Sequence, residues 1–559
     1  MGGCMDLHNK KLFFPIVILG LVIVGLLMFI AVSIYNHYYG MKHIRSQQVS
    51  PEVGEDEYNI VFKGQFNGIA FVEDGYLYFD MDVVNEDWAM GRYFYSDVEN
   101  VVFFTTSTER ISYEIGSEFY KQRNGHIFVR ASECEDRCGL QYKINYDEQL
   151  VMIRDPQGRT AEVMTSGVYL LTDPSPETQT YTAKLKKGET IEIYPCDTEG
   201  YYFASDMNGH MGYLEAEGLK TSKANLSRKE SQQIDMSDYL VKTDHIFMVF
   251  HQIYSNRYSQ EILDPIQESW AYTNVVSPTW FTLNADGTIS SNGNTDYVED
   301  VREEGDQIWA LFNNQFDDDM TYELLKHTEM RDRICDQLLK YCKQYNIHGI
   351  NVDFESMSER TERYFMQFLR ELSMTIRPAG YQLSVDVPVP SPWSDYYQRL
   401  RYSDVCDYLI LMAYDEHYPG SDAGSTSSRD FVWDAVKAMV EDEGVPCRKI
   451  ILGIPWYTRL WIGEGEDLDT EALSMDEVID LIYDYDMTVR FDPETGQNYA
   501  EGYNGDLLYR IWIEDETSLA YRLEAVKTYD LKGVAAWSYG FENWQVWDAY
   551  DAAFFNKDE

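Results

Sequence analysis

From about residue 240 onward, apolar residues come in short runs that are separated by longer amphipathic stretches. Eight of these runs have the length of strands: HIFMVFHQIY, NVVSPTWFTL, QIWALFNN, GINVDFE, QLSVDVPVP, YLILMAYDEH, KIILGIPWYTRLW and GVAAWSYG. Between them, 321–346 and 359–377 have the apolar periodicity of helices. Eight strands with helical crossovers predict an α/β fold, a closed (β/α)8 or TIM barrel over 240–555, in preference to an open sheet.

Three other parts of the chain have shorter alternating segments. Residues 58–150 and 176–222 consist of strand-like runs that are parted by Gly, Asn and Asp turns, and they predict two small β-rich modules. The runs of 176–222 have the turn spacing of a small barrel. Within the predicted TIM barrel, the stretch of about 462–530 is too long for one crossover, so it predicts a small strand-rich insertion.

A long apolar stretch lies near the amino terminus. Residues 12–35 carry no charge over 24 residues, which as a helix would span about 36 Å, enough to cross a bilayer. A cleaved signal peptide is the alternative, because Ala31 and Ser33 fit a cleavage site, but the apolar run is longer than such segments usually are. We expect one transmembrane helix in the cell membrane, with 1–11 as a cytoplasmic tail and the rest of the chain outside.

Composition narrows the possible partners and cofactors. The 94 acidic and 46 basic residues give a formal net charge of -48, a field that repels nucleic acid, so we expect no nucleic-acid partner. Eight cysteines are scattered, and only Cys134 and Cys138 lie close together, either as a local disulfide or as two free thiols. One such pair lacks the four ligands of a structural zinc site, so we predict neither a metal site nor another cofactor.

The fourth strand candidate carries an unusual set of polar residues. In HGINVDFES, residues 348–356, Asn351, Asp353 and Glu355 alternate with apolar residues. Residues two apart share a face of a strand, so these three side chains point into the barrel and rise toward its carboxyl-terminal mouth, where the sites of TIM barrels lie. Because the burial of carboxylates without a function is costly, the pattern predicts a functional site at the mouth.

The two carboxylates favour glycoside hydrolysis of a particular kind. Asp353 and Glu355 have Cα atoms about 7 Å apart on one strand, so both approach a substrate from the same side. They cannot act as an acid and a nucleophile on opposite faces of a sugar. Carboxylates on one side suit a substrate that brings its own nucleophile, such as the 2-acetamido group of an N-acetylhexosamine, and we therefore expect substrate-assisted catalysis.

This strand and four other segments resemble family 18 of the glycoside hydrolases. HGINVDFE is similar to the D-x-x-D-x-D-x-E strand of that family, LMAYDEHY at 411–418 to its M-x-Y-D segment, and GVAAWSYG to its last strand. SPTWFTLNADGTI and ILGIPWYTRLW resemble the branch of bacterial spore-cortex and cell-wall N-acetylglucosaminidases. The chain departs from the family at His348 and Asn351, where most members have acids, so the family's series of coupled carboxylates is incomplete.

The β-rich modules have resemblances of their own. Residues 58–150 are similar to a small module at the amino end of copper amine oxidases, although they have no histidine cluster for copper. Residues 176–222 are similar to a bacterial SH3 domain. Each module is either a spacer or a binder of cell-wall polymer.

The family resemblance implies catalytic roles for residues at the mouth. It makes Glu355 the general acid and later the base, and Asp353 the group that accepts the acetamido N–H. Tyr414 is implied to donate its hydroxyl to the acetamido oxygen. Asn351 is implied to bind at the site and to hold Asp353 by donating to it.

The resemblance also implies residues that bind the sugar. Trp537 on the last strand is implied to stack on the apolar face of the sugar, with Met412 and Asp415 as further lining of the pocket. Trp393 follows the fifth strand, and Trp456 and Tyr457 follow the seventh; these residues either line further subsites or pack in the core.

The predicted anchor, the small barrel and this branch of the family together imply a substrate. We expect hydrolysis of N-acetylglucosaminyl bonds in the peptidoglycan of a Gram-positive-type bacterium, with retention of the anomeric configuration. Chitin is the alternative substrate. A catalytically silent, lectin-like wall protein is the alternative from another functional class.

Overall fold

The structure is a computed structural model of the 559-residue chain. It describes residues 24, 26–30, 40–114, 116–223, 226, 234–256 and 272–555. The chain forms two compact units, the first of Met1–Tyr93 and Tyr113–Glu230, the second of Phe94–Ser112 and Ser231–Glu559. Each unit has its own sheets and its own core.

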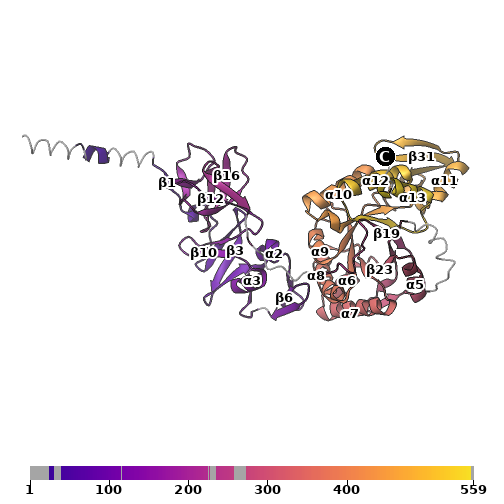
Figure 1. Ribbon diagram of the computed structural model, residues 1–559, viewed down its shortest axis with the longest axis horizontal. Helices are drawn as coiled ribbons and strands as arrows, with labels where there is room; N and C mark the ends of the chain where they lie inside the picture. Colours follow the sequence, from indigo (N-terminus) through magenta and orange to yellow (C-terminus); the bar gives the residue numbers. More distant parts are fainter. Residues whose placement is uncertain are drawn as a thin grey trace, which may run out of the picture. The chain divides into compact units, whose positions relative to one another are not determined.

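The second unit contains a closed barrel of eight parallel strands (Figure 1), which confirms the predicted TIM barrel. Each strand pairs with the next, and the last pairs with the first. In order, the strands are β19 (Ile246–His251), β20 (Val275–Pro278), β23 (Gln307–Asn313), β24 (Gly349–Asp353), β25 (Gln382–Pro388), β26 (Tyr408–Met412), β27 (Ile450–Pro455) and β33 (Gly533–Trp537).

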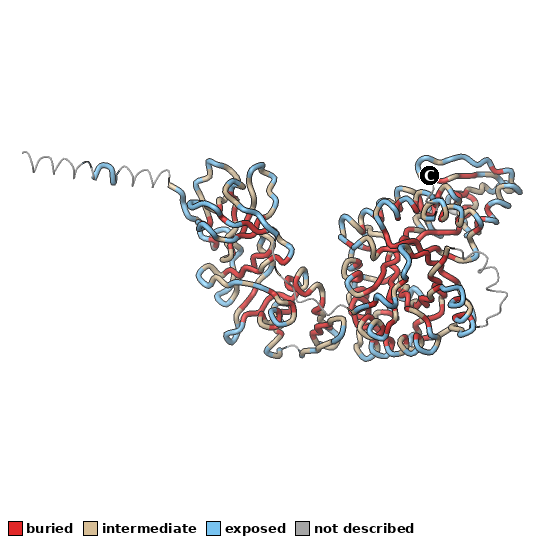
Figure 2. The backbone as a smooth tube through the Cα atoms, in the orientation of Figure 1, coloured by how far each residue is buried: buried red, intermediate tan, exposed pale blue. Residues whose placement is uncertain are grey.

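Helices surround this barrel and bury its outer face. Phe354, just after β24, packs its ring against Phe365 and Phe368, with ring centroids 5.4 and 6.0 Å apart. Buried residues accordingly follow the barrel strands, while the outer sides of the helices are exposed (Figure 2). The helices are α5 (Thr295–Glu303), α6 (Asp318–Leu325), α7 (Thr328–Tyr345), α8 (Glu359–Ile376), α9 (Arg399–Val405), α10 (Arg429–Lys437), α12 (Glu516–Thr528) and α13 (Trp544–Tyr550).

The interior of the barrel has an apolar part and a polar part. Most strands contribute apolar side chains to a buried cluster, in which the rings of Trp309 and Tyr408 stack with centroids 5.4 Å apart. In contrast, β24 and β25 place Asn351, Ser384 and Asp386 inside, all of them buried. The polar residues of the fourth strand therefore face a polar neighbour strand rather than an apolar core.

A hairpin and a five-stranded sheet extend the second unit beyond the barrel. A hairpin of β21 (Phe281–Leu283) and β22 (Ile289–Ser291) follows β20. Between β27 and α12 lies a five-stranded antiparallel sheet, in the order β29-β28-β32-β31-β30. Its elements are β28 (Thr458–Ile462), β29 (Asp469–Leu473), α11 (Met475–Asp484), β30 (Thr488–Asp492), β31 (Gln497–Asn504) and β32 (Leu507–Ile513).

The first unit consists of two sheets. The seven-stranded sheet has the order β10-β11-β2-β3-β4-β9-β8, and the eight-stranded sheet has the order β1-β14-β13-β17-β16-β15-β12-β18. The elements are β1 (Lys42–His43), β2 (Glu57–Phe62), β3 (Gln65–Glu73), β4 (Tyr76–Asp80), α2 (Met81–Asp87), β8 (Tyr120–Arg123), β9 (His126–Arg130), α3 (Ala131–Cys138), β10 (Tyr142–Asn145), β11 (Leu150–Ile153), β12 (Arg159–Val163), β13 (Val168–Leu171), β14 (Thr180–Leu185), β15 (Thr190–Tyr194), β16 (Tyr201–Ser205), β17 (Met211–Glu215) and β18 (Leu219–Lys223). Cys134 and Cys138, on α3, are buried free thiols. The resemblances of this part of the chain to a copper amine oxidase module and to an SH3 domain stay predictions.

The predicted localisation as a single-pass membrane protein is wrong. Within the part of the chain that the structure describes, no helix combines the length and the apolar sequence that a bilayer crossing requires. The two longest described helices, α7 and α8, have 18 residues each and carry charged side chains, which hydrocarbon would not solvate. Of the predicted anchor at 12–35, only residues 24 and 26–30 are described.

A ribbon from early in the chain packs on the barrel helices. Residues 94–112 belong to the second unit and include most of β5 (Tyr93–Ser96), β6 (Val101–Thr105) and β7 (Arg110–Glu114). The Phe94 ring lies 5.4 Å from the ring of Tyr364 on α8. The side chain of Gln367, also on α8, donates to Thr105 at 3.0 Å.

Buried charges lie beneath this ribbon. Glu371 on α8 accepts from Arg331 on α7 at 2.7 Å, and both side chains are almost fully buried, at 1% and 0% exposure. Arg110 of the ribbon adds a second ion pair to Glu371 at 3.0 Å. Glu371 therefore contacts two guanidinium groups, Arg110 also pairs with Asp332 at 2.7 Å, and the ribbon forms part of the environment that stabilises the helix pair.

Replacement of this carboxylate is expected to destabilise the second unit. Glu371→Gln keeps the size of the side chain but leaves Arg331 buried without its counter-charge, so the free energy of unfolding should fall by about 3–5 kcal/mol. Urea denaturation of the full chain, followed by tryptophan fluorescence, measures the change. In the control Glu323→Gln, which removes an exposed pair with Lys326, we expect almost no change, because solvent screens that pair. Equal effects of the two substitutions would contradict this account.

Candidate active site

The predicted acidic residues lie at the carboxyl-terminal end of β24. Asp353 is the last residue of that strand, and Glu355 follows two residues later; both are half-buried. Ser356 then has a positive φ of 56°, so the chain turns away directly after Glu355. The strand thus delivers both carboxylates to the barrel mouth from one side, as the alternation predicts.

Asn314 holds the backbone of Glu355 in place. Its side-chain oxygen accepts from the Glu355 N–H at 3.1 Å, and its side-chain nitrogen donates to the Glu355 carbonyl at 3.0 Å. Asn314 is buried after β23 and also donates to Thr321. Asn314 carries no local sequence signal, because its contacts join two loops that are 41 positions apart in the chain.

Asn351 points to a different partner from the one that we expected. Its side-chain nitrogen donates to Asp386 on β25 at 2.8 Å, and its oxygen accepts from Ser384 at 2.7 Å. The implied hydrogen bond from Asn351 to Asp353 is therefore replaced by one to the neighbouring strand. Asn351 is fully buried, so in this structure it presents no surface to a ligand.

Glu355 is set up to hold a proton at neutral pH. Burial, the nearby charge of Asp353 and the more distant charge of Asp415 raise the pKa of Glu355 to about 8. Burial and the neighbouring Asp386 raise the pKa of Asp353 as well. A carboxylic acid that stays protonated near pH 7 can donate its proton to a leaving group.

Tyr414 lies beside the acidic residues, after β26. Burial and the charges of Asp386, Glu355 and Asp353 raise the pKa of its hydroxyl well above the usual range. Its phenol therefore stays protonated and is available as a hydrogen-bond donor. The structure thus brings Tyr414 together with the carboxylates of two strands.

Asp415 is the exposed member of a small polar group. It has a positive φ of 54° and accepts from the Tyr457 hydroxyl at 2.6 Å and from Arg459 at 2.7 Å. Tyr457 is buried, and its hydroxyl is occupied by this contact. Met412, the last residue of β26, is half-buried at the same end of the barrel.

The predicted tryptophans occupy different environments. Trp537, at the end of β33, is half-buried with its ring 5.3 Å from that of Phe250. Trp456 is only 1% exposed and packs edge-on against Trp547 with centroids 5.6 Å apart, in the core. By contrast, Trp393 after β25 is 62% exposed. Trp537 and Trp393 present ring surface, whereas Trp456 does not.

His348 lies at the opposite end of β24 from the acidic residues. Its Nδ1 accepts from the Ile308 N–H at 3.0 Å, and burial lowers its pKa to about 4. A neutral acceptor at the amino-terminal end of the strand has a structural function. The histidine therefore does not replace the acid that most family members have at this position.

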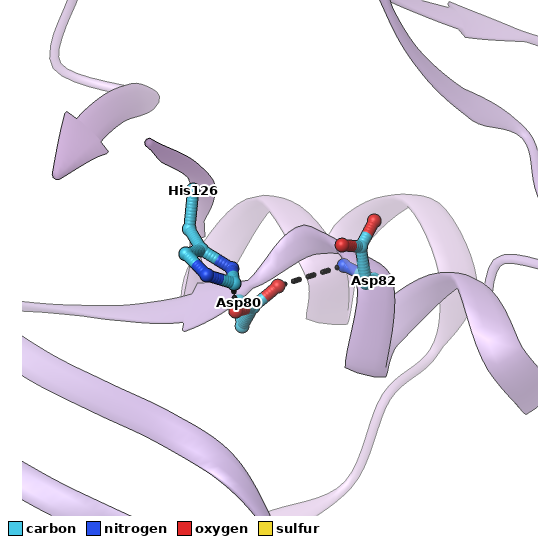
Figure 3. A group of neighbouring side chains, drawn as sticks. All are labelled: Asp80, Asp82 and His126. Carbon is cyan, nitrogen blue, oxygen red and sulfur yellow. Dashed lines mark hydrogen bonds and ion pairs between the residues drawn. The ribbon is translucent and has the colours of Figure 1, made fainter. Parts of the chain in front are cut away.

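Potential metal ligands come together elsewhere. Among the described residues, Asp80, Asp82 and His126 of the first unit form the group of three such side chains with ligand atoms close enough to share an ion (Figure 3). Asp80 caps α2 by accepting from the Asp82 N–H at 3.0 Å, and it lies 3.0 Å from the His126 ring. Helix capping and the contact between the Asp80 carboxylate and the His126 ring account for this grouping.

Curated relatives include two proteins of Bacillus subtilis. An uncharacterised glycosylase is 23% identical over 294 residues, which are 50% of this chain and 84% of the relative. A cortical fragment-lytic enzyme is 20% identical over 308 residues, 52% of this chain and 70% of the relative.

Solved structures share the fold at low sequence identity. A chitinase of Chromobacterium violaceum has a TM-score of 0.51 at 23% identity, over 56% of this chain and 100% of that chain. A spore cortex-lytic enzyme of Bacillus megaterium has a TM-score of 0.52 at 17% identity, over 67% of this chain and 79% of that chain. The sequence pattern of the glycosyl hydrolases family 18 matches residues 211–542, more than half of the chain. Because this match spans the barrel and the acidic strand, the chain belongs to family 18 of the glycosyl hydrolases.

Proposed function

We propose that this chain is a retaining glycosidase that cleaves N-acetylglucosaminyl bonds of peptidoglycan by substrate-assisted catalysis. The observation that supports this most is Glu355, a carboxylic acid with a pKa of about 8 at the barrel mouth, with Asp353 on the same face of the chain. Two carboxyl groups on one side of the substrate suit a reaction in which the sugar supplies the nucleophile.

In the first step, Glu355 donates its proton to the glycosidic oxygen, and the bond from C1 to that oxygen breaks. Asp353 accepts the acetamido N–H and turns the acetamido oxygen toward C1, where a new bond closes an oxazolinium ring. The internal nucleophile benefits from a high effective molarity. Tyr414 donates its hydroxyl to the acetamido oxygen and fixes its direction.

In the second step, Glu355 acts as a base. It takes a proton from water, the water oxygen bonds to C1, and the bond from C1 to the acetamido oxygen breaks. Two displacements at C1 retain the anomeric configuration, and Glu355 regains the proton that it lost. Trp537 would stack on the sugar at the cleavage site, and Trp393, which is exposed, would stack on a neighbouring sugar.

Peptidoglycan is favoured over chitin by the relatives that act on spore cortex, the cortical fragment-lytic enzyme and the spore cortex-lytic enzyme. The net charge of -48 gives no attraction to an anionic wall, so stacking and hydrogen bonds would carry recognition. Chitin is the second candidate, because the fold is shared with a chitinase.

Removal of the proposed acid is expected to abolish hydrolysis. In Glu355→Gln, the amide cannot protonate the leaving oxygen, so the rate should fall by at least about 10²- to 10⁴-fold. The full chain and the variant are incubated with purified peptidoglycan and with chitin oligomers, and the products are weighed by mass spectrometry. Glu359→Gln, an exposed position in the first turn of α8, is the control and should match the unaltered chain.

The products distinguish the candidate functions. Muropeptides that end in reducing N-acetylglucosamine would support the peptidoglycan proposal, and chitin fragments alone would favour the second candidate. Binding of either polymer by the unaltered chain, without any product, would show a lectin-like protein and overturn the proposed reaction.

The pH profile should depend on the charges around Glu355. The reaction needs protonated Glu355, so kcat/KM should fall as pH rises through about 8, the pKa of the free enzyme. Asp415 is one of the charges that raise this pKa. In Asp415→Asn, the fall of kcat/KM at high pH, the basic limb of the profile, should therefore move to lower pH. Initial rates measured from about pH 5 to about pH 10, a range that brackets the titration of Glu355, give the shift.

A matched control is Asp422→Asn, which changes an exposed acid in the loop after β26 and should leave the basic limb in place. A limb that stays at the same pH in Asp415→Asn would mean that a group other than Glu355 sets it.

A further inference from the structure

Asp386 is a buried acid that the predicted site did not include. It lies on β25, which pairs in parallel with β24 in the register Asn351 to Ser384 and Val352 to Val385. Continued by one residue, this register sets Asp386 beside Asp353. Side chains opposite each other on neighbouring strands share a face, so both carboxyl groups point into the barrel.

One oxygen of Asp386 is held by a chain of hydrogen bonds. Ser384 donates to the oxygen of Asn351 at 2.7 Å, which fixes the orientation of that amide, and the amide nitrogen donates to Oδ2 of Asp386 at 2.8 Å. Asp386 is only 4% exposed, so solvent cannot easily supply other donors. The amide thus locks one carboxylate oxygen and leaves the other for a different partner.

Two carboxylate oxygens in this group lack a donor. Oδ1 of Asp353 and Oδ1 of Asp386 are both buried, and neither has a hydrogen-bond partner among the described residues. An unsatisfied buried carboxylate oxygen is costly. A single proton held between the two acids turns one of them into a donor and satisfies both sides.

We propose that Asp386 is a positioning residue of the reaction: it shares one proton with Asp353 and takes that proton when Asp353 turns to the substrate. This inference rests on the proposed function. In the transfer, the O–H bond at Asp353 breaks and an O–H bond at Asp386 forms, and the pair keeps a total charge of minus one. Asp353 is then a carboxylate and accepts the acetamido N–H.

The electrostatic surroundings support a shared proton. Burial and the like charge of Asp386 raise the pKa of Asp353, and burial raises the pKa of Asp386 while the hydrogen bond from the Asn351 amide lowers it, so Asp353 holds the proton in the resting state. Glu355, from the same strand end, adds a like charge that raises the pKa of Asp386 further. Tyr414, two residues after the end of β26, lies near both acids as a neutral phenol.

The arrangement explains how the chain departs from its family. Asn351 stands where most members have an acid, and the missing carboxyl group is present on the next strand as Asp386. Asp353 therefore keeps an acidic neighbour although its own strand has lost one.

A reciprocal substitution in the full chain tests this proposal. Asp386→Asn keeps an oxygen that accepts from Asn351 but removes the proton acceptor, so kcat should fall by about 100-fold with little change in KM. Asn351→Asp combined with Asp386→Asn returns one acid to the group and should recover kcat to within about 10-fold of the unaltered chain. Activity on peptidoglycan and on chitin oligomers is measured across the pH range.

The matched control is Asp306→Asn. Asp306 is also buried, with an oxygen that has no partner among the described residues and with burial that raises its pKa to about 7. It precedes β23, at the opposite end of the barrel from the mouth. Its substitution should leave kcat and the pH profile unchanged.

Two outcomes would overturn the role of Asp386: an Asp386→Asn variant with the kcat and pH profile of the unaltered chain, or a double variant no more active than the single one. Infrared difference spectra test the pair without any turnover. At neutral pH, the Glu355→Gln variant should show a protonated carboxyl band. That band should be missing when Asp386→Asn is added to the same variant. If the unaltered chain cleaves neither polymer, the proposed function fails, and this band alone decides whether the two acids share a proton; its absence overturns the inference.

Discussion

The chemistry of this protein depends on the burial of several carboxyl groups in one sector of a closed barrel. Apolar side chains fill the interior from most strands, while β24 and β25 bring Asn351, Asp353 and Asp386 to the same place. Like charges at this density cannot all be ionised in a medium of low dielectric constant. The group must therefore retain protons at neutral pH, and a retained proton is what an acid catalyst needs.

The rest of the second unit holds this sector in position. Phe354 alternates with the acids and anchors the strand outward against α8 through Phe365 and Phe368. Asn314 clamps the backbone of Glu355 from the loop after β23. The direction of the acids is thus set by apolar packing on one side of the strand and by backbone hydrogen bonds at its end, so the carboxyl groups need no ionic partner that would lower their pKa.

On the helices, a buried carboxylate has a different function, because its neighbours are cations. Glu371 is more deeply buried than the acids of the barrel, but Arg331 and Arg110 lie against it, and an ionised carboxylate is stabilised by such partners. Burial with a cation makes a structural ion pair, and burial among other acids makes a proton donor. The segment 94–112, which comes from an early part of the chain, contributes to the first kind of environment.

The sequence by itself determined the barrel, the order of its strands and the outward or inward direction of each residue in HGINVDFES, because period-two and helical patterns are local properties of the chain. It also indicated that Asp353, Glu355 and Tyr414 belong together. Only the tertiary structure decided which residues surround them: Asp386 and Asn314 come from other strands and loops. It also decided that Trp547 covers Trp456. Hydropathy alone predicted a membrane span at 12–35, and no described helix provides one. Pairing across strands and burial depend on contacts between distant parts of the chain, and no local pattern contains them.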